Sequence, residues 1–158
     1  MKTISLHRLL YFLALATLAV GVAQAATNGL VNAKSGPARG VIVLSDDASP
    51  GEQYAAKELQ EHLRLITGVT LPQMPEGQYS AAKRPCFSIG RTAMSGKYVT
   101  DAQVAAFGND GYSVFRRNGN AFFVGGRQRG AMYAVYQYLE SLGVRWYSPD
   151  YTVIPQLE

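Results

Sequence analysis

The chain has 158 residues, of which 47% are hydrophobic and 16% are charged, and its formal net charge is +4. This length suits one domain of ordinary size, and the composition predicts a packed core, which excludes an intrinsically disordered chain. The basic residues are scattered along the sequence, so the small positive charge does not indicate a nucleic-acid surface and no nucleic-acid partner is expected.

The first 25 residues, 1–25, have the pattern of a secretory signal peptide. A basic start with Lys2 and Arg8 is followed by an apolar run and by the small-residue motif Ala23-Gln24-Ala25. An apolar run of about 14 residues is too short for a spanning helix, which needs about 20. We therefore expect cleavage near Ala25, export to the periplasm or the extracellular space, and no stable membrane anchor.

A short leader and the first strand follow the expected cleavage site. Residues 26–37 are mostly small and polar, and we interpret them as a leader with one short strand at 30–33. The globular domain is expected over residues 38–155. Its first strand is the β-branched run GVIVLS, residues 40–45.

A helix is expected directly after this strand. Ser49 is placed as the N-cap, Pro50 takes the first helical position, and Glu52 completes a capping box. Apolar residues then recur on one helical face, and Gly68 supplies a left-handed residue after the last turn. The helix should therefore end near residue 67.

Short elements follow in the middle of the chain. We expect an extended piece at residues 69–73, a strand at 87–89 after a loop rich in proline and glycine, and a helical turn around 102–107. Cys86 is the single cysteine, so no internal disulfide can form. Its apolar neighbours predict a small buried side chain rather than a reactive thiol.

The last third contains a hairpin, a helix and a strand. The segment GYSVFRRNGNAFFVGG reads as two strands joined by a type I′ turn at Asn118-Gly119. Apolar residues at helical spacing from Met132 to Leu142 predict a second amphipathic helix, which Gly143 closes. A final strand is expected at residues 144–147, before a Pro-Asp turn.

The order of these elements indicates the fold class. Runs of strands that include an antiparallel hairpin, together with two helices that each have one apolar face, predict an α/β (α+β) fold. We expect a mixed, partly antiparallel sheet with two helices packed on one face.

The turn GGRQRG, which precedes the second helix, is a candidate phosphate-binding loop. Its spacing differs from the dinucleotide fingerprint, and no Gly-Lys-Ser or Gly-Lys-Thr follows. We interpret it as a tight turn in which Gly130 lets the helix pack closely. No nucleotide and no cofactor are expected.

Side chains suited to metal or nucleophile chemistry are few. After removal of the signal peptide, His62 is the one remaining histidine, so no metal site and no Ser-His-Asp triad are expected. A glycosidase needs two carboxyl groups about 5 to 10 Å apart. Five aspartates lie at or near strand ends or turns, but nothing in the sequence pairs them, and aspartate often serves the turn itself. They are Asp46, Asp47, Asp101, Asp110 and Asp150.

Aromatic residues concentrate in the last third of the chain. Flat rings beside arginine can form sugar platforms, whereas core and interface packing is the simpler interpretation. The set comprises Tyr112, Phe115, Phe122, Phe123, Tyr133, Tyr136, Tyr138, Trp146, Tyr147 and Tyr151.

Three segments together resemble a known family. They are PGEQYAAKELQEHLRLITGVTLP, a short strand that ends in IGRT, and NDGYSVFRRNGNAFFVGGRQRGAMYAVYQYLESLGVRWYSPD. They resemble the N-terminal domain of family 67 alpha-glucuronidases and of similar exported glycoside hydrolases, a domain related in fold to the second domain of family 20 beta-hexosaminidases. The resemblance covers roughly residues 38–155 and implies a mixed sheet with two helices on one side.

The resemblance also implies where catalysis takes place. In that family the catalytic carboxylates belong to a (β/α)8 barrel that follows this domain, and the barrel is expected to begin about where the given sequence ends. No carboxylate of this chain matches a catalytic position, so no catalytic residue is assigned. The expected partner is such a barrel in a parent glycoside hydrolase.

The expected function is that of an exported, non-catalytic accessory domain of an alpha-glucuronidase-like or hexosaminidase-like enzyme in polysaccharide breakdown. The alternative is a stand-alone module that binds glycan or protein, with carbohydrate as a candidate ligand. Strand alternation in VRWYSPD puts Arg145 and Tyr147 on one face and Val144 and Trp146 on the other. We therefore predict that Arg145 and Tyr147 contact the barrel or the substrate.

Overall fold

The computed structural model describes residues 39–80, 84–126 and 128–156. The predicted signal peptide and the leader with its short strand lie outside these ranges. Within the described ranges, no helix is both long enough and apolar enough to cross a membrane.

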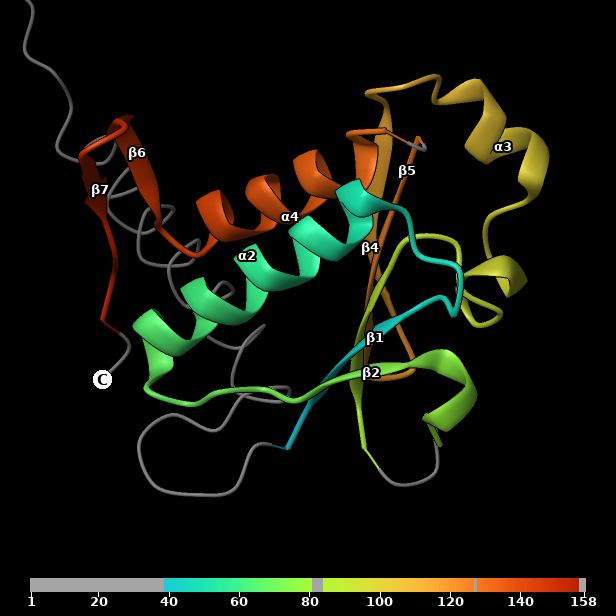
Figure 1. The fold of residues 1–158 in the computed structure, drawn as a ribbon, viewed down its shortest axis with the longest axis horizontal. Coiled ribbons are helices and arrows are strands. Elements are labelled where there is room, and N and C mark those ends of the chain that lie inside the picture. The colour runs from blue at the N-terminus through green and yellow to red at the C-terminus, as the bar shows by residue number, and fades with distance from the viewer. Residues whose placement is uncertain (1–38, 81–83, 127, 157–158) are drawn as a thin grey trace, which may run out of the picture.

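A five-stranded sheet forms the centre of the domain (Figure 1). In the order β2-β1-β3-β5-β4, the first four strands run parallel and β4 is antiparallel to β5. The mixed, partly antiparallel sheet expected from the sequence is thus confirmed. The strands are β1 (Val41–Leu44), β2 (Gln73–Pro75), β3 (Cys86–Ile89), β4 (Tyr112–Arg117) and β5 (Asn120–Gly125).

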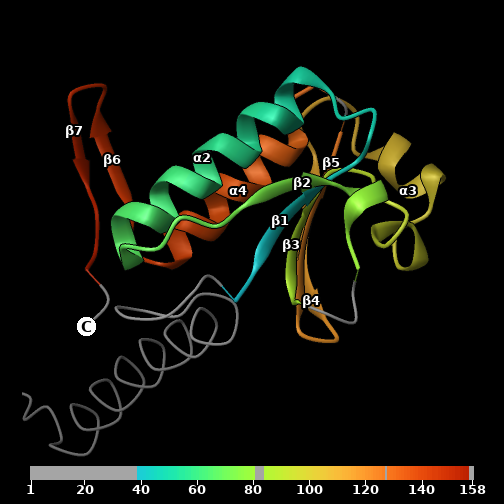
Figure 2. The same ribbon diagram turned by 60° about the horizontal axis from the view of Figure 1, so that its bottom comes forward.

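Two amphipathic helices, α2 (Pro50–Thr67) and α4 (Gly130–Ser141), cover one face of this sheet (Figure 2). Their apolar sides meet the sheet in one core, in which Leu59, Leu139 and Phe87 are fully buried. Both helices lie on the same face, as the sequence predicts. Burial of both apolar sides against the sheet is what stabilises them, since short helices are marginal in water.

The ends of α2 are those that the sequence predicts. The Ser49 hydroxyl accepts a hydrogen bond from the Glu52 amide, and the Glu52 carboxylate accepts one from the Ser49 amide at 2.8 Å. Gly68 has φ of 75°, a left-handed conformation that favours glycine. At the hairpin turn, Asn118 and Gly119 have φ of 51° and 79°, as a type I′ turn requires.

The opposite face of the sheet is covered by a segment whose packing there was not predicted from the sequence. Along β5, Phe123 faces the helices, whereas Phe122 and Val124 face the segment that holds the 3-10 helix η2 (Ser95–Lys97) and α3 (Asp101–Ala106). The helical turn expected near residues 102–107 is α3. A smaller apolar cluster therefore lies between this segment and the sheet.

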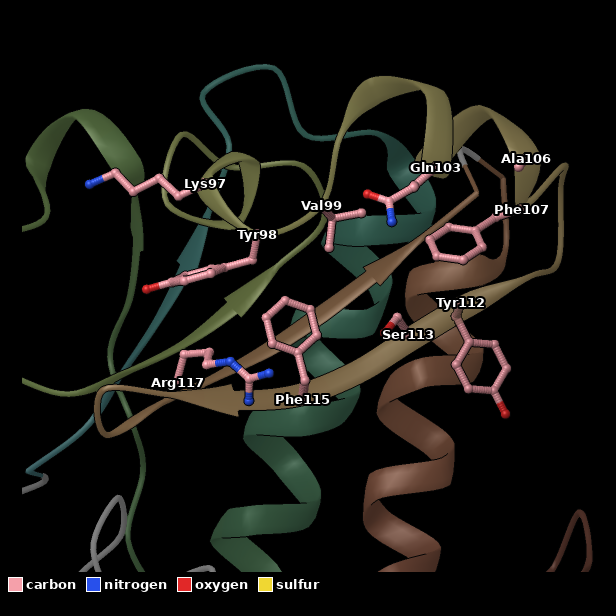
Figure 3. A pocket seen from close by; sticks show the side chains of 10 residues that line it. All are labelled: Lys97, Tyr98, Val99, Gln103, Ala106, Phe107, Tyr112, Ser113, Phe115 and Arg117. Carbon is pink, nitrogen blue, oxygen red and sulfur yellow. The ribbon is translucent and has the colours of Figure 1, made fainter.

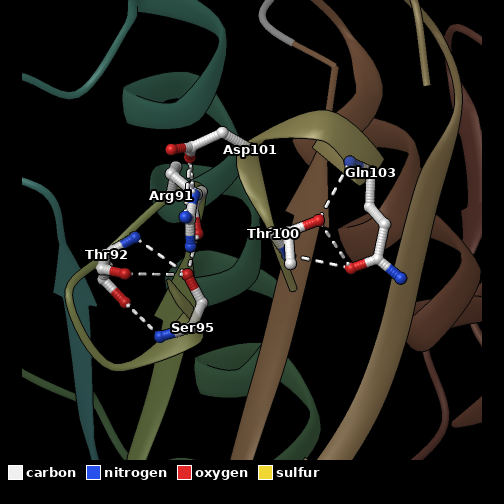
Figure 4. A network of polar contacts seen from close by, with 7 residues as sticks. Arg91, Thr92, Ser95, Thr100, Asp101 and Gln103 are labelled. Atoms are coloured by element: carbon white, nitrogen blue, oxygen red, sulfur yellow. Dashed lines mark hydrogen bonds and ion pairs between the residues drawn. The ribbon is translucent and has the colours of Figure 1, made fainter. Parts of the chain in front are cut away.

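Polar contacts hold this segment against the end of β3 (Figure 4). The buried Ser95 donates its amide to Thr92 Oγ1 at 3.1 Å and its hydroxyl to the carbonyls of Gly90 and Thr92. Arg91 forms an ion pair with Asp101 at 2.6 Å, at the start of α3. The turn after β3 and α3 are thus tied together.

The chain ends in a second, separate sheet. β6 (Arg145–Ser148) is the final strand that the sequence predicts, but it pairs with β7 (Tyr151–Val153), which was not predicted, and not with the five-stranded sheet. Figure 1 places this hairpin at the end of the helices that lies far from α3. The extended piece expected at residues 69–73 lies mostly before β2, which is followed by a 3-10 turn, η1 (Glu76–Gln78).

Candidate functional site

The outer face of the β6–β7 hairpin carries four exposed side chains: Arg145, Tyr147, Tyr151 and Val153. We call these four residues the hairpin face. Tyr147 is 67% exposed and Tyr151 is 59% exposed, and their rings stack with centroids 5.5 Å apart. Exposed apolar side chains that gather in one place are typical of a surface that contacts a partner.

The inner face of the same hairpin is anchored to the helices. Val144, which precedes β6, is fully buried, and the half-buried Trp146 packs edge-on against His62 and Tyr136, with ring centroids 5.4 and 5.1 Å away. This confirms the predicted alternation along the strand. The hairpin face is therefore held in a fixed position relative to the helices.

Arg145 has a local structural role as well. Its Nη1 atom donates to the carbonyl of Glu140 at 2.6 Å and to that of Val144 at 2.7 Å. A cation is favourable here because the last carbonyls of a helix carry partial negative charge. The predicted contact of Arg145 and Tyr147 with a barrel or a substrate stays a prediction.

The glycine-rich turn brings backbone segments into close contact. A Cβ atom at Gly130 would lie 2.8 Å from the Gly125 Cα atom and closer still to the Gly111 carbonyl oxygen. A Cβ atom at Gly126 would overlap the Gly108 carbonyl oxygen. The interpretation of these glycines as a tight turn that lets α4 pack closely is confirmed.

The five aspartates are distributed over several places. Asp47 and Asp101 line one hollow of about 640 Å³, together with Glu52 and Arg91, where β1 and β3 end. The Asp46 carboxylate accepts a hydrogen bond from the Gly77 amide at 3.3 Å, so it serves a turn. The two others lie elsewhere: Asp110 precedes β4, and Asp150 lies in the turn between β6 and β7.

The carboxylates in and near this hollow have structural partners. Glu52 caps α2, Asp101 pairs with Arg91, and Asp47 accepts a hydrogen bond from the Ser45 hydroxyl. Glycoside cleavage requires one carboxyl group with a raised pKa beside an ionised one. These three carboxylates instead hold a helix start, an ion pair and a turn.

Asp110 is held in its ionised form by a neighbouring arginine. Arg129 donates to both of its carboxylate oxygens, at 2.7 and 3.0 Å, and this hydrogen bonding lowers the pKa of Asp110 below its usual value. A carboxyl group that stays ionised suits an ion pair, not a general acid. We infer that Asp110 helps to position the start of α4.

The sequence belongs to a described family. Residues 24–138 match the family model of the glycosyl hydrolase family 67 N-terminus. The chain belongs to this family. The resemblance to the N-terminal domain of family 67 enzymes is therefore confirmed, while no curated protein matches the chain.

Because the chain is a family 67 N-terminal domain, it is an accessory domain of a glycoside hydrolase. The family also implies a parent enzyme with a catalytic domain. The matched segment ends at Tyr138, within α4, so the hairpin face lies beyond it. The family match alone thus gives no role to Tyr147 or Tyr151.

Sequence reasoning missed part of the hairpin face in this family 67 N-terminal domain. From the sequence, Tyr151 is one of the aromatic residues of the last third, and Val153 has no predicted role. The alternation in Tyr151-Thr152-Val153 directly after a Pro-Asp turn is the signal that would have revealed a second strand. Its shortness made this signal weak.

The described residues of this family 67 domain give little support for a metal site or a reactive thiol. Among those residues, no group of three or more His, Cys, Asp or Glu side chains could hold a metal ion. Cys86 is fully buried, as predicted, and burial raises the pKa of its thiol to about 11. A thiol with such a pKa stays protonated at neutral pH and is a poor nucleophile.

Proposed function

We propose that this chain is an exported, non-catalytic accessory domain that supports the catalytic domain of a family 67 glycoside hydrolase in polysaccharide breakdown. The observation that carries the proposal is the family match over residues 24–138. The catalytic domain is a (β/α)8 barrel in the proposed parent, and the enzyme is alpha-glucuronidase-like or hexosaminidase-like.

The hairpin face is the proposed contact with that catalytic domain. Its two stacked tyrosines are the most exposed of the large hydrophobic side chains in the described ranges. Tyrosine is enriched in protein interfaces because its ring offers a large apolar area and its hydroxyl can still bond to water or a partner. Arg145 would add a charge at the rim of this contact.

The non-catalytic role is supported by the state of the carboxylates. Asp47, Asp101 and Glu52 share a hollow, but each is engaged in a local contact that fixes a turn or a helix start. We expect the purified chain to show no turnover of aryl glucuronides or aryl N-acetylhexosaminides. Turnover that survives purification and disappears in Asp47→Asn or Asp101→Asn would contradict the proposal.

Export is proposed from the pattern of residues 1–25. Expression of the full chain in a bacterial host, followed by N-terminal sequencing of the product in the periplasm or medium, tests it. The expected mature chain begins at or near Ala26. A cytoplasmic product that retains residues 1–25 would contradict export.

A further inference from the structure

A second hollow, of about 760 Å³, lies on the face of the sheet opposite α2 and α4 (Figure 3). It lies between the segment with η2 and α3 on one side and β4 on the other. Its volume is within the range of ligand pockets, about 300 to 1,000 Å³. Neither the family match nor the proposed docking to a catalytic domain assigns a role to it.

Aromatic rings form one side of this hollow. The Phe115 ring stacks on that of its cross-strand neighbour Phe122, with centroids 5.0 Å apart, and Tyr98 packs edge-on against both. Phe122 is buried, whereas Tyr98 remains 41% exposed. The buried ring thus supports two rings that line the hollow, which is the rigid apolar surface on which the C–H face of a sugar packs.

The two charged side chains that line the hollow are both basic. Lys97 and Arg117 are among its ten lining residues, and none of the ten carries a carboxylate. Among the described residues, neither cation forms an ion pair. An anionic group on a ligand would therefore find a favourable potential without displacing a partner.

Arg117 is positioned to bring its charge next to the rings. Its guanidinium carbon lies 5.9 Å from the centroid of the Phe115 ring, and its Nη1 atom donates to the Arg116 carbonyl at 2.8 Å. These contacts hold the side chain over the aromatic surface, and a guanidinium has five N–H donors, so most remain free for a ligand.

Uncharged polar groups complete the lining. The Gln103 side-chain oxygen accepts hydrogen bonds from the amide and the hydroxyl of Thr100, so its NH2 group has no partner among the described residues. Ser113 lies on β4 beside Phe115 in the lining. Such groups can bond to sugar hydroxyls.

We propose that this hollow binds a saccharide that carries an anionic group, with a sugar ring on Tyr98 and Phe115 and the anion at Lys97 and Arg117. The aromatic surface accounts for the sugar ring, and the unpaired cations account for the negative charge. The site lies on the opposite side of the sheet from the helices that anchor the hairpin face. It can therefore be occupied while the hairpin face is covered.

An NMR titration of the full chain tests the site with three sugars that differ only at C6: galacturonic acid, galactose 6-sulfate and galactose. At least one of the two anionic sugars should shift the amide signals of Tyr98, Ser113 and Phe115, with a Kd of about 1 mM. Galactose should bind about tenfold more weakly, because it lacks the charge-assisted hydrogen bonds. The tighter of the two anionic sugars identifies a carboxylate or a sulfate as the preferred group.

Charge-removing variants supply the control. Arg117→Gln and Lys97→Gln should each weaken binding of the anionic sugar by about tenfold. Lys57→Gln removes an exposed charge from α2, on the other side of the sheet, and should leave the Kd unchanged. All three positions are exposed, so the fold should be retained, which the remaining amide signals verify.

Several outcomes would overturn the site. Equal affinity for galactose and the anionic sugars would show that the cations do not contribute to binding. An unchanged Kd in Arg117→Gln would show the same. Amide shifts confined to other parts of the chain would place the site elsewhere. Displacement of the sugar by a glutamate-rich peptide of higher affinity would show that the surface recognises an acidic protein instead.

Discussion

At the scale of single residues, Trp146 and its neighbour Arg145 have opposite surroundings in the same strand. Trp146 packs on His62 and Tyr136, so Trp146→Ala should lower the free energy of unfolding by about 3 kcal/mol. Arg145→Ala removes two hydrogen bonds from an exposed side chain and should cost only about 1 kcal/mol. Thermal unfolding of both variants measures the difference.

The order of the two effects is the decisive result. In a domain of this size, the tryptophan variant should lose roughly 10 °C in Tm, and the arginine variant a few degrees at most. A larger loss in Tm for Arg145→Ala than for Trp146→Ala would mean that the buried and exposed faces of β6 are assigned the wrong way round. The hairpin face could then not be the exposed side of the strand.

At the scale of secondary-structure elements, the contact between α4 and the sheet depends on glycine. Gly130→Ala would push a methyl group against the backbone of Gly125 and Gly111, where no flexible side chain can yield. We expect a loss of about 2 kcal/mol or more in the free energy of unfolding. Gln137→Ala, at an exposed position of the same helix, should change it by less than about 0.5 kcal/mol.

Urea unfolding of the two α4 variants gives these free energies directly. A Gly130→Ala variant as stable as the wild type would show that the turn can open to accept a side chain. In that case the close approach of backbones would no longer explain the glycine-rich sequence, and a ligand-binding role for the turn would have to be considered again.

Most elements of the fold follow from local signals in the sequence. The ends of α2 were predictable because Ser49, Glu52 and Gly68 act on backbone groups within one turn of themselves. The type I′ turn at Asn118-Gly119 was predictable for the same reason. These local contacts do not depend on the rest of the chain.

The features that sequence reasoning missed are set by distant contacts. The helical turn of α3 was predicted, but the packing of the segment around η2 and α3 on the sheet was not, because it depends on Phe122, Val124 and the contacts of Ser95. β7 has only three residues, and its structure depends on pairing with β6. The stacked Tyr147 and Tyr151, and the cations beside Tyr98 and Phe115, are likewise brought together by the fold.

At the scale of the whole molecule, two candidate surfaces lie apart. The β6–β7 hairpin lies at one end of the helices, and α3 lies far from it, beyond the sheet (Figure 1). The hollow is lined by residues of α3 and β4. The proposed docking to a catalytic domain and the proposed binding of an anionic sugar therefore use different residues of the chain. A variant that removes one function should leave the other intact.

The central claim is that this family 67 N-terminal domain docks on a catalytic domain through its hairpin face. Isothermal titration calorimetry of the chain with the separately produced catalytic domain of its parent enzyme tests it most directly. The double variant Tyr147→Ser/Tyr151→Ser should weaken binding by at least about tenfold, because central aromatic contacts dominate interface energies. Tyr133→Ser, an exposed tyrosine near the start of α4, is the matched control and should bind like the wild type. Equal affinity of the double variant and the wild type, or no binding by the wild-type chain, would contradict the claim.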